Sequence, residues 1–180
     1  MRALLVIDMQ KGSFTERNPR FNHTEVVEKI NALATAFRKA KSPVIFIQHD
    51  GTREQAFVPG TTAWELLDEI DWQPDDIIIS KTANDAFYRS DLSSVLESYQ
   101  IQDLIVTGCA TDFCVAATVQ SALTKDYTIT VVEDGHTTGE RPHLTAKQVI
   151  DHYNWVWQHI APTQGRIYVE EFARIKSSFG

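Results

Sequence analysis

The sequence has little of what marks a disulfide-stabilised fold or a nucleic-acid partner. Only two cysteines occur in 180 residues, so a framework of disulfide bonds cannot hold the chain together. The 17 basic residues are outnumbered by 24 acidic ones, which gives a formal net charge of −7, and no block of like charge occurs. We therefore expect no nucleic-acid partner and no anionic membrane partner.

Long apolar runs are also missing. Residues 3–7 form one of the longest runs, far short of the ~20 residues that a membrane-spanning helix needs. Asp8 ends this run before the apolar region of a signal peptide could form. With few cysteines and no targeting pattern, we expect a cytoplasmic protein.

The composition is that of an ordinary folded protein. Hydrophobic residues make up 43% of the chain and charged residues 23%, so neither disorder nor a fibrous repeat is indicated. A chain of 180 residues has room for one core but hardly for two. We expect a single domain over residues 1–180.

Short apolar runs predict buried strands. They cover residues 3–7, 44–48, 77–79, 104–107 and 128–132, with a weaker sixth at 166–169. The first four runs are continuously apolar rather than alternating, as is typical of parallel strands covered on both faces.

Segments with helical periodicity lie between these strands. Their apolar residues recur at helical spacing over residues 26–37, 92–99, 115–122 and 146–153, with capping candidates at Asn22, Thr24, Ser90, Thr111 and Asp112. Thr62 and Glu65 form a capping-box signature for a further helix, and Pro142 suits the first turn of the last one. The alternating order predicts a three-layer α/β sandwich, with a doubly wound, six-stranded, mainly parallel sheet and helices on both faces.

Reactive side chains follow several of the predicted strands. Asp8, His49 and Lys81 come at or just after the ends of the first three, and Cys114 follows the fourth. Since ligands bind at the carboxyl ends of parallel strands, these side chains are expected to converge. A carboxylate, a cation and a thiol together match the pattern of an activated nucleophile.

The thiol of Cys114 is the candidate nucleophile. It falls near the start of a predicted helix, where free N–H groups and a neighbouring Lys81 would hold its pKa below that of an ordinary cysteine. Two plainer interpretations stay open: both cysteines are small buried hydrophobic residues, and Asp8 accepts hydrogen bonds in a turn.

These residues also carry a resemblance. Asp8-Met9-Gln10, Lys81 with Phe87 after it, and residues 108–115, which read GCATDFCV, resemble the isochorismatase-like cysteine hydrolase superfamily. The resemblance implies a catalytic triad of Asp8, Lys81 and Cys114. It also implies a cis peptide bond before Ala110, whose N–H would join that of Cys114 in an oxyanion hole.

The same resemblance bears on metals and cofactors. Nicotinamidases of this superfamily that contain a metal carry an Asp-x-His pair after the second strand, whereas this chain has Gln48-His49-Asp50-Gly51 and no histidine between His49 and His136. A zinc site needs at least three well-placed ligands. We therefore expect no metal, no organic cofactor and a substrate other than nicotinamide.

Residues near the strand ends are the candidates for substrate binding, and other aromatic and histidine side chains are expected to have structural roles. The substrate-binding candidates are Gln10, Phe14, His49, Phe57, Phe87 and Tyr88, while a structural hydrogen bond remains an alternative for His49. Trp64 is expected to be a core residue. For His136, His143, His152 and His159 we expect surface or capping roles.

Trp155 and Trp157 fall on different faces of the last predicted helix. One of them should therefore be exposed, and an exposed tryptophan often marks a subunit contact. With the resemblance, this favours a homodimer or homotetramer.

The sequence thus predicts a cysteine hydrolase that cleaves a C–N bond of a small amide or carbamoyl compound through a thioester. An isochorismatase-type hydrolase, a non-catalytic small-molecule binding protein and a thiol redox protein are the alternatives. The spacing of Cys109 and Cys114 is not the Cys-x-x-Cys arrangement of redox proteins. The substrate itself is not identified, because the loops at residues 10–20 and 50–65 follow no pattern that specifies it.

Overall fold

A computed structural model describes residues 1–179. Its strands are β1 (Arg2–Ile7), β2 (Val44–His49), β3 (Ile77–Lys81), β4 (Asp103–Cys109), β5 (Thr128–Thr137) and β6 (Ile167–Glu170). Its α-helices are α1 (His23–Lys39), α2 (Leu92–Ser98), α3 (Ala116–Leu123), α4 (Ala146–His159) and α5 (Phe172–Ser177). Two 3-10 turns, η1 (Lys11–Ser13) and η2 (Thr52–Glu54), and one π-helical turn, η3 (Thr111–Val115), complete the list.

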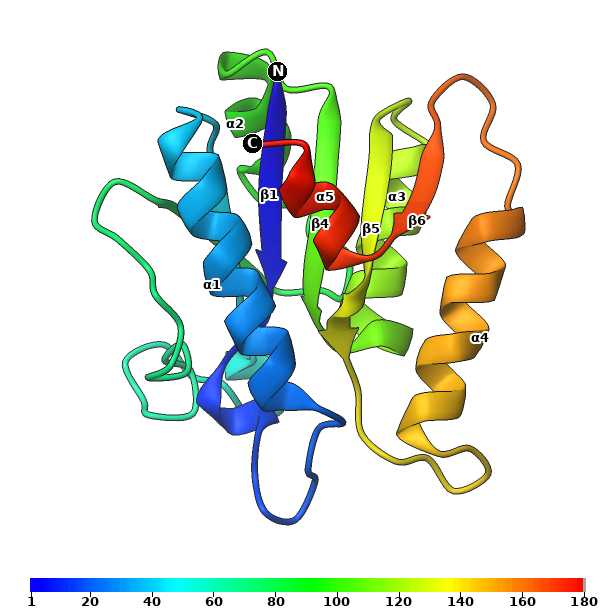
Figure 1. Cartoon of the computed structure of the whole chain (residues 1–180). Coiled ribbons are helices and arrows are strands. Elements are labelled where there is room, and N and C mark those ends of the chain that lie inside the picture. The colour runs from blue at the N-terminus through cyan, green and yellow to red at the C-terminus, as the bar shows by residue number, and fades with distance from the viewer. Residues whose placement is uncertain (180) are drawn as a thin grey trace.

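All the strands pair in parallel, in the order β3-β2-β1-β4-β5-β6. The chain therefore builds the sheet outward from β1 in one direction and from β4 in the other (Figure 1). The predicted α/β sandwich is confirmed, and its sheet is wholly rather than mainly parallel. The switch in strand order falls between β1 and β4, where parallel sheets bind their ligands.

The two faces of the sheet are covered by different helices. Leu4 and Val6 of β1 pack with α1 and α5, whereas Leu5 and Ile7 pack with α2, α3 and Trp157 of α4. Figure 1 shows α1 and α5 in front of the sheet and α2 and α3 behind it. Since successive strand residues point to opposite faces, a strand buried on both sides must be apolar throughout, as β1 is.

The expected helix after Thr62 is not formed. Residues 55–76 contain no helix, and an isolated antiparallel bridge joins Leu66 to Gln10 after β1. Lys11 N–H donates to Glu65 O, and Leu67 N–H donates to Met9 O. The Glu65 carboxylate pairs with the Lys11 ammonium at 2.8 Å instead of completing a capping box. Contacts with a distant segment thus replace the hydrogen bonds of a helix.

The last long helix begins later than Pro142 suggested. Thr145 caps α4, and its side chain and that of Gln148 form a reciprocal capping box. Pro142 lies three residues before this cap, in a turn closed by the Arg141–Leu144 bridge. Within residues 1–179, no helix has both the length and the apolar character needed to cross a membrane.

Candidate active site

The side chains of Asp8, Lys81 and Cys114 meet at the carboxyl edge of the sheet. The Lys81 ammonium lies 2.7 Å from Asp8 Oδ2 and 3.3 Å from Cys114 Sγ. The ammonium is held further by the carbonyl of Ala83 at 2.9 Å. Lys81 is 1% exposed, and a buried lysine is rare unless it is paired. The three residues therefore form one connected group.

Lys81 reaches this group across a neighbouring strand. It is the last residue of β3, and the sheet order places β2 between β3 and β1. Neighbouring strands lie roughly 4.8 Å apart, so about 10 Å separates β3 from β1 and only a long cationic side chain spans the gap. The ammonium passes His49 at the end of β2, with 3.4 Å between Lys81 Nζ and His49 Nδ1.

The backbone brings β1 and β4 close together at the site. Gly108 has a φ of 120°, and a Cβ atom at this position would clash with the backbone of Ile7. Only glycine permits both the conformation and the approach. Asp8, the residue after Ile7, has a φ of 48°, and its N–H donates to Ile47 O. The glycine that opens the GCATDFCV stretch thus serves the packing of β4 against β1.

Cys114 lies in a π-helical turn that leads into α3. The turn begins after Ala110, and its first hydrogen bond of π type runs from Val115 N–H to Ala110 O. Asp112 fastens the turn from outside, since Arg141 Nε donates to its carboxylate at 2.7 Å. Sequence periodicity predicted an α-helix here, but Cys114 lies in a π-helical turn, which is wider than an α-helical turn and precedes α3.

The expectation of a lowered thiol pKa is wrong for the free protein. Burial and the Asp8 carboxylate raise the pKa of Cys114, and this outweighs the opposite effect of Lys81. The thiol of Cys114 is therefore neutral in the resting protein. Asp8 Oδ1 is buried and has no hydrogen-bond partner among residues 1–179, so it is free to accept a proton.

Backbone N–H groups lie next to the thiol. The peptide bond between Cys109 and Ala110 is cis. Within the described chain, the Ala110 N–H has no backbone acceptor, and the Cys114 N–H precedes the first π-type hydrogen bond of its turn. Both Ala110 and Cys114 line one cavity, so these groups border the space where a substrate carbonyl would lie.

That cavity has a volume of about 220 Å³. Its lining residues are Asp8, Gln10, Ser13, Arg20, His49, Phe57, Asn84, Cys109, Ala110, Phe113 and Cys114. Larger hollows exist, including one of about 590 Å³ between α1 and the C-terminal residues, but its lining holds no thiol, histidine or carboxylate. The cavity at the strand ends is therefore the candidate active site on chemical grounds.

Three of the predicted substrate-binding residues line this cavity, and they interact differently with the rest of the protein. Gln10 is fully buried: its side-chain amide donates to the carbonyls of His49 and Trp64 and accepts from the His49 N–H. Gln10 therefore has a structural role, because its hydrogen bonds connect the ends of β1 and β2. His49 has its pKa lowered by burial and by the charge of Lys81, so the ring is neutral at neutral pH. Phe57 stands edge-on to that ring.

The geometry does not support substrate contact for Phe14, Phe87 and Tyr88. Phe87 is 7% exposed and stacks on Tyr127 in the core. Tyr88 is exposed and lies outside the cavity lining. Phe14 packs against the apolar cluster beneath α1. Phe14 follows η1, while Phe87 and Tyr88 lie on the connection between β3 and α2, and none of the three lines the cavity.

Five lining residues were not among the predicted site residues, and one of them, Cys109, was expected to be a buried hydrophobic residue. Phe113 sits inside the GCATDFCV stretch, one position before the cysteine, and its neighbourhood could have suggested it. Asn84 approaches Cys114 Sγ at 3.6 Å. Ser13 and Arg20 come from the irregular segment after β1, where no periodicity indicates which side chains turn inward.

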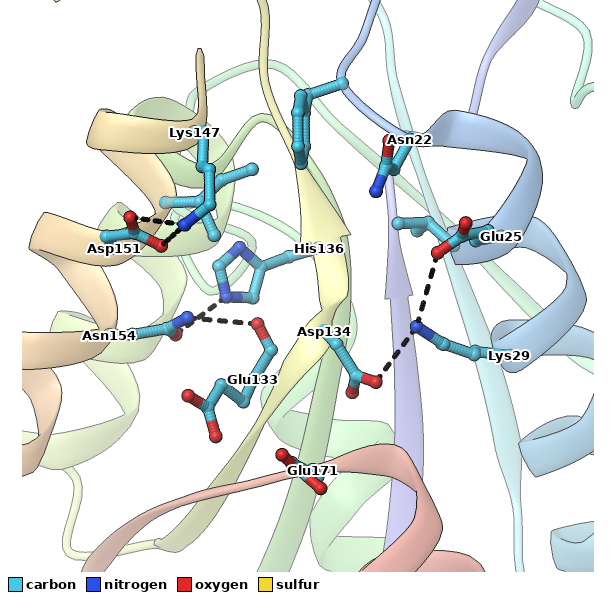
Figure 2. Close-up of a pocket in the computed structure, with 13 residues that line it drawn as sticks. Asn22, Glu25, Lys29, Glu133, Asp134, His136, Lys147, Asp151, Asn154 and Glu171 are labelled. Atoms are coloured by element: carbon cyan, nitrogen blue, oxygen red, sulfur yellow. Dashed lines mark hydrogen bonds and ion pairs between the residues drawn. The ribbon is translucent and has the colours of Figure 1, made fainter. Parts of the chain in front are cut away.

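A second cavity lies between α1, β5 and α4 (Figure 2). Its volume is about 260 Å³, and carboxylates dominate its lining. Both of its lysines are already paired, Lys29 with Asp134 at 2.9 Å and Lys147 with Asp151 at 2.6 Å. Among residues 1–179, no group of three or more histidine, cysteine or acidic side chains has the arrangement of a metal site.

His136 lines the second cavity and is a core residue, contrary to the surface or capping role expected for it. It is 2% exposed. The amide nitrogen of Asn154 donates to Glu133 O, so Asn154 Oδ1 accepts from His136 Nε2–H at 2.9 Å. His136 Nδ1 then accepts from the hydroxyl of Thr111. This chain of hydrogen bonds holds Thr111, the residue after Ala110, in place.

We expect His136 to make the fold sensitive to acid. Burial lowers the pKa of His136 from its ordinary 6.5 to about 4. Between these values the unfolded chain binds more protons than the folded one, so the stabilisation is complete above pH 6.5 and is lost as the pH falls toward 4. The loss should be about 3 kcal/mol.

The measurement is urea unfolding of wild type and His136→Gln at pH 7 and pH 4. Carboxylates titrate in both proteins, so the difference between the two pH dependences reports His136 alone. Parallel stability profiles for the two proteins would contradict this assignment.

Comparisons with known proteins identify the family of the chain. A model of the isochorismatase domain family matches residues 2–160. A crystal structure of an isochorismatase family protein superposes with a TM-score of 0.84 and 33% identity, covering 92% of this chain and 96% of that one. The chain belongs to the isochorismatase family.

Relatives with assigned activities are more distant. Streptothricin hydrolase of Streptomyces noursei is 28% identical over 142 residues, which covers 79% of this chain and 51% of the relative. Ureidoacrylate amidohydrolase of Pseudomonas syringae pv. syringae is 31% identical over 169 residues, covering 73% and 69%. This chain spans about half the length of the streptothricin hydrolases that it matches.

Proposed function

We propose that this protein is a cysteine hydrolase that cleaves the C–N bond of a small amide or carbamoyl compound. The observation that carries the proposal is the buried contact of Lys81 with both Asp8 and Cys114, at 2.7 and 3.3 Å. A binding protein has no need of a carboxylate, a cation and a thiol in one connected group. The names of the hydrolase relatives support the same reaction class.

In the first half-reaction, Asp8 takes the Cys114 proton as the sulfur attacks the substrate carbonyl. Burial and the Asp8 carboxylate raise the pKa of the thiol, which favours proton transfer during the attack. The N–H groups of Ala110 and Cys114 hold the negative oxygen of the tetrahedral intermediate. The C–N bond then breaks, and Asp8 returns the proton to the departing ammonia or amine, which leaves a thioester on Cys114.

In the second half-reaction, water replaces the amine. Asp8 takes a proton from the water, the hydroxide attacks the thioester, and the sulfur leaves and regains the proton. The products are a carboxylic or carbamic acid and the free thiol. Lys81 keeps its charge throughout and holds the carboxylate and the sulfur in register, while no organic cofactor takes part.

A screen of small primary amides and ureido acids for ammonia release tests this function. Mass spectrometry of rapidly acidified reaction mixtures should show an acyl adduct on the peptide that contains Cys114. Failure to release ammonia from any compound, with no adduct formed, would contradict the proposal. Titration of thiols before and after mild oxidation addresses the redox alternative, which requires that Cys109 and Cys114 be lost together without dimer formation.

We expect no metal to be required. The described residues offer no set of metal ligands at the site, and His49 contacts Lys81. Turnover of a substrate found in the screen should therefore be unchanged within about twofold after treatment with a strong chelator. The check is elemental analysis together with activity, before and after chelation. Stoichiometric zinc whose removal abolishes turnover would overturn the expectation.

We further propose that the chain forms a homodimer or homotetramer through helices on the outer faces of the sheet. Trp155 on α4 is 57% exposed, whereas Trp157 on the same helix is 2% exposed, as the helical spacing predicted. Light scattering at micromolar concentration should give a multiple of the 20.4 kDa chain mass. A mass equal to that of one chain would contradict the proposal.

A further inference from the structure

The candidate active site carries one positive charge that the triad does not use. Only two of the cavity's lining residues carry a formal charge at neutral pH, namely Asp8 and Arg20. Asp8 is neutralised by Lys81 at 2.7 Å, and the pKa of His49 is lowered, so its ring adds no charge. Arg20 therefore sets the net charge of the cavity wall.

The Arg20 guanidinium is oriented by a hydrogen bond that uses only one of its nitrogens. Nε donates to Ser13 O at 2.7 Å, which anchors the side chain to the segment after β1. Among residues 1–179, Arg20 makes no ion pair and its two terminal nitrogens have no hydrogen-bond acceptor. The contrast with Arg141 is direct, because Arg141 donates from two nitrogens to the carboxylate of Asp112.

A guanidinium that is held in place but lacks an anion matches one kind of ligand group. Its two terminal nitrogens form a planar fork that binds a carboxylate through two parallel hydrogen bonds. The rest of the cavity offers aromatic walls at Phe57 and Phe113 and the thiol at Cys114. The volume of this cavity, about 220 Å³, is smaller than that of pockets that bind drug-sized ligands, so a small substrate is expected.

Resting on the proposed function, we infer that Arg20 selects substrates that carry a carboxylate in addition to the scissile amide. The substrate class is then a small ω-amido or ureido acid, with its carbonyl at Cys114 and its carboxylate at Arg20. Neutral amides of the same size would lack the second anchor. Arg20 acts as a specificity residue, since it takes no part in proton transfer.

A pair of alkylating reagents tests this inference without knowledge of the substrate. Iodoacetate and iodoacetamide both transfer a two-carbon group to sulfur with loss of iodide, and they differ in carrying a carboxylate or a neutral amide. The rate of Cys114 labelling by each reagent is followed by mass spectrometry in wild type, Arg20→Gln, Arg20→Lys and Arg17→Gln. Arg17 is exposed on the same segment, so its variant is a control for loss of charge.

The informative quantity is the ratio of the iodoacetate rate to the iodoacetamide rate. We expect Arg20→Gln to lower this ratio about tenfold, as the loss of one charge-assisted contact would. Arg20→Lys should keep part of the preference, and Arg17→Gln should leave the ratio within about twofold of wild type. An unchanged ratio in Arg20→Gln would overturn the inference, as would an equal fall in Arg17→Gln.

The outcomes separate this inference from the proposed function. A ratio that depends on Arg20 in a protein that hydrolyses no amide would refute the function and leave the anion site standing. Ammonia release by wild type with a ratio indifferent to Arg20 would refute the anion site alone. If neither reagent labelled Cys114, both would fail, because the proposed reaction requires Asp8 to take the thiol proton while the sulfur attacks an electrophile in this cavity.

Discussion

Cys114→Ala is expected to lower turnover by at least 10³-fold and to leave the fold intact. The sulfur forms the covalent bond in the proposed reaction. Removing the nucleophile of a hydrolase lowers turnover by about 10³-fold or more, because only substrate binding and the oxyanion hole then contribute to the rate. Stability should change little because Cys114 is partly buried beside a cavity and only one sulfur atom is removed. Steady-state ammonia release and thermal unfolding are the two measurements.

Cys109→Ala is the matched control. Cys109 lies at the end of β4 and is 1% exposed, whereas Cys114 is partly exposed at the cavity and lies 3.3 Å from the Lys81 ammonium. Cys109 should therefore label far more slowly than Cys114, and its replacement should keep at least about a tenth of the turnover. If Cys114→Ala stayed active on a confirmed substrate, or if Cys109 labelled first, Cys114 could not be the nucleophile.

Lys81→Met should cost the protein both its activity and much of its stability. The lysine side chain is fully buried, and its removal leaves the Asp8 carboxylate without a cation. Breaking a buried ion pair in this way lowers the free energy of unfolding by about 3 to 5 kcal/mol. Labelling of Cys114 should also slow, because the Lys81 ammonium is the group that favours the thiolate by lowering the pKa of Cys114. Urea unfolding followed by tryptophan fluorescence gives the first quantity, and alkylation rates give the second.

The double variant Asp8→Asn/Lys81→Met distinguishes an ion pair from simple loss of packing. With both charges removed, stability should recover part of the loss, while turnover stays absent because no base remains. Lys39→Met, at an exposed position on α1, should change stability by no more than about 0.5 kcal/mol. A Lys81→Met protein as stable as the Lys39→Met control would refute the buried pair.

The fold could be predicted from the sequence where one physical signal dominated. The run at residues 3–7 is apolar at every position because β1 is covered on both faces, and nothing competes with that signal. The Thr62 and Glu65 signature failed because a local hydrogen-bonding pattern competed with pairing to residues after β1. Local patterns lose to tertiary contacts most readily in long connections of this kind.

The candidate site shows the same division. Asp8, Lys81 and Cys114 could be brought together from the strand ends because parallel strands finish at one edge. The direction of the Cys114 pKa could not, since it depends on burial and on the side of the sulfur that Asp8 occupies. Arg20 lies beyond any periodic element, so only the backbone path of its segment reveals that it enters the cavity.

The position of β3 in the sheet has a consequence for how the protein loses activity. β3 is an edge strand, it pairs only with β2, and Ile78 and Ser80 on it are exposed. Such strands open locally at a lower free-energy cost than the central strands. Opening of β3 alone would carry Lys81 away from Asp8 and Cys114 while the central strands stayed paired. The proposed catalytic group therefore depends on the pairing of an edge strand as well as on the packing of the core.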